Sequence, residues 1–192
     1  MIELDSPILT AEELERIRGL RHPDFRVRTI SLLYPSAKNL QSALAELFAA
    51  CDRACREGVN IVILSDRGLD GEHLAIPSLL AVSAVHKHLV KTKKCTALSL
   101  ILESGEPREV HHFATLLGYG ACAINPYLAH ETIGQLIDEG LLDKDYYAAV
   151  QDYDNAILNG IVKIASKMGI STIQSYQSAQ IFEAVGICPE VI

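Results

Sequence analysis

Four short polar segments each follow a run of apolar residues that is typical of a buried strand. Their side chains carry the carboxylate, hydroxyl, amide and guanidinium groups that fix a small ligand or line a polar passage. The candidate residues are Ser65, Asp66, Arg67, Glu103, Ser104, Asn125, Gln174 and Ser175. Parallel strands end at one edge of a sheet, where ligands bind, so we expect these residues on one rim. Ordinary turns also favour Asp, Asn and Ser, which is the competing interpretation.

The charged residues near these segments allow more than one pairing. Asp66 and Arg67 either form a local ion pair that orders the turn or contact a ligand. For Glu103 we favour a pair with Arg108 over an unpaired, partly buried carboxyl group. Lys163 and Lys167 precede a polar segment at 171–172, where they would contact an anion or, equally, cap the end of a helix.

Neither the histidines nor the glycines predict a metal or nucleotide site. His111 and His112 are adjacent on a predicted helix and therefore point about 100° apart, and His86 and His88 have the same difficulty. The segment 118–120, Gly-Tyr-Gly, leads from a helix into a strand, which is the wrong order for a phosphate cradle. The sequence contains no GxGxxG, Walker or GxSxG motif. We therefore predict no catalytic residue, no metal and no cofactor within this chain.

Composition indicates an ordinary globular protein of one domain. The 192 residues are 49% hydrophobic and 21% charged, with a net charge of −7 that argues against nucleic-acid or membrane-surface binding. The first residues do not resemble a signal peptide, and no window approaches the length of a membrane span. The five cysteines form no CxxC pair, so we expect reduced, buried thiols in a cytoplasmic protein and no iron–sulfur site.

Apolar periodicity predicts strands that alternate with helices. The expected strands are 27–34, 59–64, 97–102, 121–124 and 171–175, and the expected helices are 10–20, 40–55, 77–91, 109–117, 131–139, 143–168 and 180–184. Thr10 and Glu13 have the spacing of a capping box that starts the first helix. The long helix 143–168 is expected to bend or break near Asn159 and Gly160. The pattern predicts an α/β fold: a parallel sheet of βα units, open or an incomplete (β/α) barrel, with an N-terminal helical arm over 1–25 and one globular unit over 26–192.

The amino-acid sequence of these segments resembles the central domain of glutamate synthase, of the large-subunit or ferredoxin-dependent type. The order and spacing of the motifs agree, and they cover nearly the whole chain. The matching segments are Leu4–Leu9, Ile63–Gly68, Ile76–Val82, Glu103–Phe113, Leu117–Ala121, Asn125–Ala129 and Ser166–Thr172.

This resemblance implies a function that the residues alone do not. Enzymes of the family release ammonia from glutamine in an amidotransferase domain and use it on an FMN-bearing barrel to make glutamate from 2-oxoglutarate. The central domain links the two, contributes to the ammonia channel, and has an α/β fold that echoes the FMN barrel without closing. We therefore expect a scaffold and channel wall, with the amidotransferase and FMN domains as partners. The FMN and iron–sulfur cluster of the parent enzyme are expected outside this chain.

Two departures from the family limit what the chain does alone. An amidotransferase of this type needs an N-terminal cysteine, whereas this sequence opens with Met1 and Ile2, so we expect an excised domain or one part of a split enzyme. Where the family usually has Ser-Tyr-Arg-Gly, this chain has Gln177 in place of the arginine, which weakens any anion contact there. We expect the isolated chain to be inactive and to self-associate through exposed apolar surface. The alternatives are a stand-alone module that binds a small acid at its strand ends, and a self-sufficient flavin enzyme, which the missing phosphate cradle disfavours.

Overall fold

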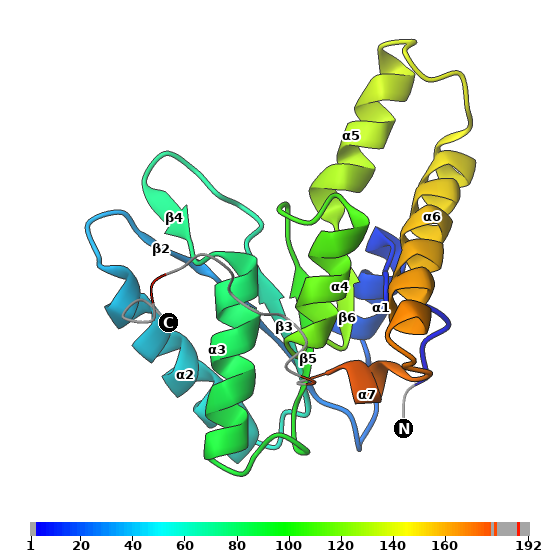
Figure 1. Ribbon diagram of the computed structural model, residues 1–192. Helices are drawn as coiled ribbons and strands as arrows, with labels where there is room; N and C mark the ends of the chain where they lie inside the picture. Colours follow the sequence, from blue (N-terminus) through cyan, green and yellow to red (C-terminus); the bar gives the residue numbers. More distant parts are fainter. Residues whose placement is uncertain (1–2, 178, 180–187, 189–192) are drawn as a thin grey trace.

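Strands and helices alternate along the chain, as the apolar pattern predicts (Figure 1). The computed structural model describes residues 3–177, 179 and 188, so the helix predicted at 180–184 lies outside the described residues. The strands are β1 (Val27–Ser31), β2 (Leu33–Pro35), β3 (Ile61–Ser65), β4 (His73–Ala75), β5 (Ser99–Glu103) and β6 (Ala123–Asn125). The helices are α1 (Ala11–Arg18), α2 (Leu40–Arg56), α3 (Ser78–Lys91), α4 (Val110–Gly118), α5 (Tyr127–Asp138), α6 (Tyr146–Lys167) and α7 (Ile173–Tyr176).

The main sheet has four parallel strands in the order β1-β3-β5-β6 and stays open. This confirms the predicted α/β class with an open parallel sheet. The register pairs Ser31 with Ser65, Ser65 with Glu103, and Glu103 with Asn125, so the last residues of the four strands form one row. A separate antiparallel pair, β2 with β4, lies beyond this edge of the sheet.

Both faces of the main sheet are buried, because alternate side chains of each strand point to opposite faces. Val62 and Leu64 belong to a large core formed with α2, α3, α4 and α6. Ile61 and Ile63 belong to a smaller core on the other face, where the covering residues come from α1 and the segment before it. The sequence of β3 is therefore apolar at nearly every position because both faces of the strand are buried, as in other parallel sheets.

The N-terminal segment covers this second face of the sheet. Thr10 and Glu13 form the predicted capping box at the start of α1. Leu14 and Ile17 on α1 are buried, and Ile8 forms a parallel bridge with Ile124 on β6. The residues expected as an arm thus pack directly on the sheet, because their apolar side chains fill a face that α2, α3 and α4 leave open.

Two predicted strands differ in the structure. The run 27–34 is interrupted at Leu32, which is fully buried and whose backbone N–H bonds to Ser65 O, so β1 and β2 are separate strands. The predicted fifth strand at 171–175 is wrong, because this segment forms the short helix α7. Thr172 caps that helix by accepting a hydrogen bond from the backbone of Ser175, and Ile173 and Tyr176 pack toward α4 at helical spacing.

Helix α6 runs without interruption through Asn159 and Gly160, where a bend or break was expected. Gly160 lies against Val110 of α4, and a Cβ atom at this position would be 2.5 Å from a methyl carbon of Val110. The glycine therefore allows the two helices to approach closely and does not break α6.

Replacing Gly160 by alanine should destabilise the protein, although alanine is the better helix former. The new methyl group must displace Val110, and overpacking of this kind costs about 1–3 kcal/mol. The matched control is Gly134→Ala in α5, where the added carbon meets Tyr146 at an ordinary 3.4 Å and helix propensity should stabilise by up to about 1 kcal/mol. Urea unfolding curves of both variants measure the difference, and equal effects at both positions would contradict the packing argument.

Candidate functional site

Six of the eight predicted rim residues gather at the carboxyl edge of the sheet. Ser65, Glu103 and Asn125 are the last residues of three neighbouring strands and lie side by side in the register. Asp66 and Ser104 follow directly and are also buried, whereas Arg67 is partly exposed. The alternation of apolar strand and polar turn was therefore a sufficient signal to bring these residues together.

Glu103 is the centre of this rim. The residue is only 4% exposed. Its carboxylate accepts hydrogen bonds from Arg18 Nη2 at 2.8 Å, Ser65 Oγ at 2.6 Å and Arg67 Nε at 3.2 Å. The predicted pair with Arg108 is wrong. Arg108 is exposed and its backbone carbonyl accepts a hydrogen bond from Tyr153, which places this residue toward α6. A buried carboxylate requires such partners, because desolvation without them is costly.

Asp66 faces the loop between β5 and α4. Its carboxylate accepts hydrogen bonds from Ser104 Oγ and from the backbone N–H of Gly105 at 3.1 Å. Burial, together with the charge of Asp66 and a hydrogen bond to it, raises the pKa of Tyr127 to about 12. The phenol therefore stays protonated at neutral pH and donates to Asp66. The local pair between Asp66 and Arg67 does not form, because their side chains point to different partners.

Arg67 joins the strand ends to α5. Its guanidinium bonds to Glu103 and, through Nη1 at 2.9 Å, to Glu131, and it lies 4.2 Å above the ring of Tyr127. Burial opposes the charge on Arg67, but the hydrogen bond and charge of Glu131 and the charge of Glu103 outweigh burial, so its pKa is raised. Sequence reasoning missed Glu131 and Arg18. Glu131 lies one turn after Tyr127 on a helix that starts at the rim, which was the available signal.

Asn125 fixes the N-terminal segment to the edge strand. Its Nδ2 donates to the carbonyl of Leu9 at 2.8 Å, within the buried interior. Backbone bonds from Leu9 N to Ile124 O and from Ile124 N to Pro7 O, both at 2.8 Å, add residues 7–9 to the edge of β6. The amide of Asn125 therefore has a structural partner on the segment that leads into α1.

Gln174 and Ser175 do not join the rim. Both are exposed on α7, which lies beside the opposite end of β6, since the neighbouring Gln177 donates to the carbonyl of Ala121 at 3.0 Å. The prediction that Gln174 shares a rim with Asp66, Glu103 and Asn125 is wrong. It depended on a fifth strand, which the structure replaces with a helix.

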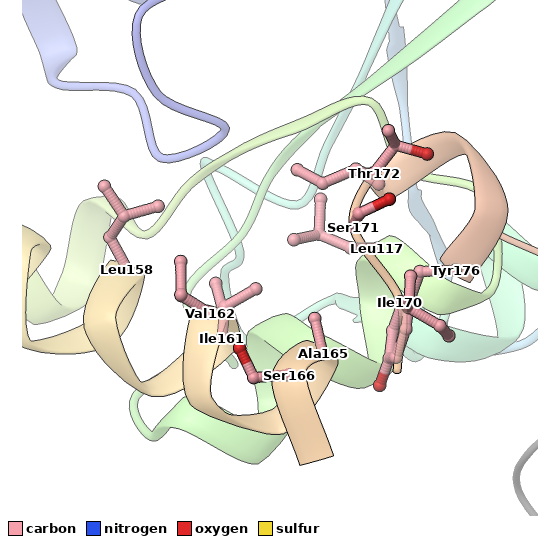
Figure 2. A pocket seen from close by; sticks show the side chains of 11 residues that line it. Leu117, Leu158, Ile161, Val162, Ala165, Ser166, Ile170, Ser171, Thr172 and Tyr176 are labelled. Carbon is pink, nitrogen blue, oxygen red and sulfur yellow. The ribbon is translucent and has the colours of Figure 1, made fainter. Parts of the chain in front are cut away.

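A cavity of about 220 Å³ lies between α4, α6 and α7 (Figure 2). Its wall is mainly carbon, with Leu158, Ile161 and Val162 of α6 pointing inward and a few hydroxyl groups such as that of Ser166 at its border. Lys163 and Lys167 are exposed on α6 and do not line this cavity. An anion contact at these lysines stays a prediction, without a polar cavity beside them.

No group of three or more metal-ligating side chains occurs in the part of the chain that the structure describes. The histidines have structural contacts: His86 packs closely on Gly120, His88 bonds to Asp52, and the ring of His112 accepts a hydrogen bond from the backbone of Arg108. Burial lowers the pKa of His86.

The cysteines are free, but their expected burial is only partly correct. Cys51 is buried, and burial raises the pKa of its thiol to about 12, whereas Cys55 is half-buried. Cys95, Cys122 and Cys188 are exposed. Cys95 and Cys122 lie in the turns that precede β5 and β6, not within the buried strands themselves.

The N-terminus of α3 is occupied by a side chain of the same protein. The backbone N–H and hydroxyl of Ser78, at the start of α3, already bind the carboxylate of Glu106 at 3.0 and 2.5 Å. A helix N-terminus holds a phosphate through free N–H groups, and here a carboxylate of the same chain takes that place.

The helices in the described part of the chain include no candidate for a membrane span.

Known proteins resemble this chain over its whole length. The family model for the glutamate synthase central domain matches residues 1–188. The glutamate synthase [NADPH] large chain of Bacillus subtilis is 49% identical over 191 residues, which are 100% of this chain and 12% of that protein. The glutamate synthase [NADH] of Schizosaccharomyces pombe is 40% identical, and the ferredoxin-dependent glutamate synthase of Pyropia yezoensis 38% identical, each over 100% of this chain. The chain spans 9–13% of the length of these relatives.

Solved structures show similarity in fold. A flavocytochrome b2 with sulfite bound superposes with a TM-score of 0.55 and 16% identity, over 95% of this chain and 43% of that chain. The flavin-binding domain of baker's yeast flavocytochrome b2 gives a TM-score of 0.52 at 17% identity, over 75% and 36% of the two chains. At such identities the likeness concerns the fold alone. The family match and the close relatives together place this chain in the glutamate synthase central domain family.

Proposed function

We propose that this chain is the linking domain of a glutamate synthase, a scaffold and part of the ammonia-channel wall between the glutamine amidotransferase and FMN synthase domains. The complete enzyme would make glutamate from glutamine and 2-oxoglutarate. The relatives support this proposal, because their glutamate synthase chains contain a segment 35–49% identical to this one within a much longer polypeptide.

The observation that carries the proposal is the closed polar network of the rim. Glu103 is bound by Arg18, Arg67 and Ser65, and Asp66 is bound by Ser104 and Gly105. A catalytic carboxylate needs an open position from which it can reach a substrate. Here the buried carboxylates are occupied by groups of the chain itself, which favours a rigid polar wall over a reaction centre.

The cofactors of the proposed enzyme would be held by its other domains. The α3 N-terminus is bound by Glu106, so this chain offers no phosphate position there. We expect FMN and an iron–sulfur cluster in other domains of the proposed enzyme. The alternative function, binding of a small acid, has one observation in its favour: Arg67 is half-exposed at the rim and would be accessible to a carboxylate ligand.

Calorimetry of this chain with FMN and with 2-oxoglutarate separates the two functions. We expect no micromolar binding of either compound, because Arg67 is engaged by Glu103 and Glu131 and the α3 N-terminus by Glu106. Micromolar binding of 2-oxoglutarate that disappears in Arg67→Met would establish the small-acid module instead. Micromolar binding of FMN would contradict the scaffold proposal directly.

Replacing Arg18 by methionine should destabilise the chain by about 3 kcal/mol, because Glu103 would remain buried with Arg67 as its only cation. Arg16→Met is the matched control in the same helix turn. Its ion pair with Glu12 joins two side chains that are both largely exposed, so a change of about 0.5 kcal/mol or less is expected. Chemical unfolding measures both variants, and an Arg18 effect no larger than that of Arg16 would show that the buried network contributes little.

The channel proposal predicts that the same substitution uncouples the two reactions in the glutamate synthase that contains this chain. Glutamine hydrolysis should persist in Arg18→Met, while less glutamate forms per glutamine consumed and more free ammonia appears. Arg16→Met should keep the original ratio. A proportional loss of both activities, or an unchanged ratio of glutamate to glutamine in a folded Arg18 variant, would contradict the proposal that the rim is part of the channel wall.

A further inference from the structure

The distal part of the hairpin formed by α5 and α6, residues 127–154, carries most of the net charge of the protein. Residues 127–154 contain seven carboxylates and a single lysine, a formal charge of −6 out of −7 for the chain. This hairpin rises beyond the end of the sheet, and its turn is the most distant point of the fold on that side (Figure 1). The charge is therefore concentrated on a projecting element.

Some of these carboxylates stabilise the hairpin itself. Asp154 bonds to the buried His130 at 2.8 Å, Asp152 pairs with Lys144, and Asp145 caps the start of α6. Asp138 and Asp143, which flank the turn, are exposed and form no ion pair within the described part of the chain. Their charge is thus available to an external partner.

Exposed apolar side chains lie among these carboxylates. Leu141 in the turn is 71% exposed and Tyr147 on α6 is 70% exposed, with Leu136 and Tyr146 partly exposed beside them. The rings of Tyr146 and Tyr147 contact each other edge to face at 5.6 Å between centroids. Large apolar and aromatic side chains inside a polar border are typical of the centre of a protein interface.

One of these side chains, that of Tyr146, packs within the hairpin itself. Gly134 on α5 lies against the ring of Tyr146, and a Cβ atom at this position would be in ordinary contact with that ring at 3.4 Å. The bond from His130 to Asp154 joins the bases of the two helices. Because the two helices are joined in this way, the backbone that carries the exposed side chains loses little conformational entropy on binding.

We propose that the hairpin tip, defined as Leu136, Asp138, Leu141, Asp143, Tyr146 and Tyr147, docks on a basic surface with an apolar pocket in another part of the same glutamate synthase. The inference rests on the proposed function, and nine-tenths of each relative lies outside the segment that matches this chain. Charge decides against a second copy of the chain, because two tips of this sign would repel each other. Leu141 and Tyr147 supply the buried contact, and Asp138 and Asp143 supply its charged border.

A photo-crosslinking residue in place of Leu141 tests the docking in the glutamate synthase that contains this chain. Mass spectrometry of Leu141→benzoylphenylalanine should identify a peptide from outside residues 1–192 with lysine or arginine nearby. The same probe at Leu74, which is 47% exposed on β4, measures the background. A yield no higher than at Leu74, or a product formed only with a second copy of this chain, would overturn the proposal.

Charge reversal tests the stated chemistry of the partner. Asp138→Lys with Asp143→Lys should reduce the crosslink yield by about fivefold, because the acidic border would then repel a basic surface. Glu3→Lys with Glu72→Lys gives the same change in net charge away from the tip and should leave the yield unchanged. Equal crosslink yields in the two double variants would contradict a basic docking surface. A crosslink outside the chain with an unchanged ammonia ratio in the Arg18 variant would retain the docking contact and reject the channel.

Discussion

The burial of one carboxylate, that of Glu103 at the end of a central strand, governs the arrangement around the rim. A charge in this position is stable only with cations that reach it at hydrogen-bond distance. Arg18 reaches Glu103 from α1 and Arg67 reaches it from the turn after β3, so two segments 49 residues apart are tied to one side chain. Arg67 then extends the network to Glu131 on α5. Helix α1, the sheet edge and the base of the acidic hairpin are consequently connected through a single ionic cluster.

The same network helps to attach the N-terminal segment to the open sheet. Among the described residues the main sheet has four strands, and its second face is covered by the N-terminal segment. Leu14 and Ile17 of α1 fill that face, and Asn125 together with Arg18 fixes the two ends of the covering segment. The N-terminal segment therefore covers the second face of the sheet, and it is attached to the sheet at the polar rim.

Local patterns predicted the elements well, whereas the partners of the rim depended on tertiary contacts. The apolar runs located β3 and β5, and the Thr10–Glu13 spacing located the start of α1, because these signals lie within a few residues. The pair of Arg18 with Glu103 spans 85 residues, and nothing in either local sequence distinguishes Arg18 from Arg108 as the partner. The segment 171–175 is short and of mixed polarity, so its apolar pattern did not reveal the helix that the Thr172 cap starts. Gly160 was misread because a helix interior can require glycine for close packing with Val110.

The distribution of charge separates two kinds of polar surface in this molecule. At the rim, carboxylates alternate with guanidinium groups and hydroxyls within one network, so the cluster satisfies its own electrostatic requirements and has little attraction left for a partner. In residues 127–154 of the hairpin there are seven carboxylates and a single lysine, and this imbalance lies next to exposed tyrosine and leucine side chains. The like charges of the hairpin repel one another, and a basic surface of a partner would relieve this repulsion. The rim is therefore suited to form a channel wall, and the hairpin is suited to contact a partner. Glu131 belongs to both surfaces, and through Arg67 it connects the docking element to the proposed channel wall.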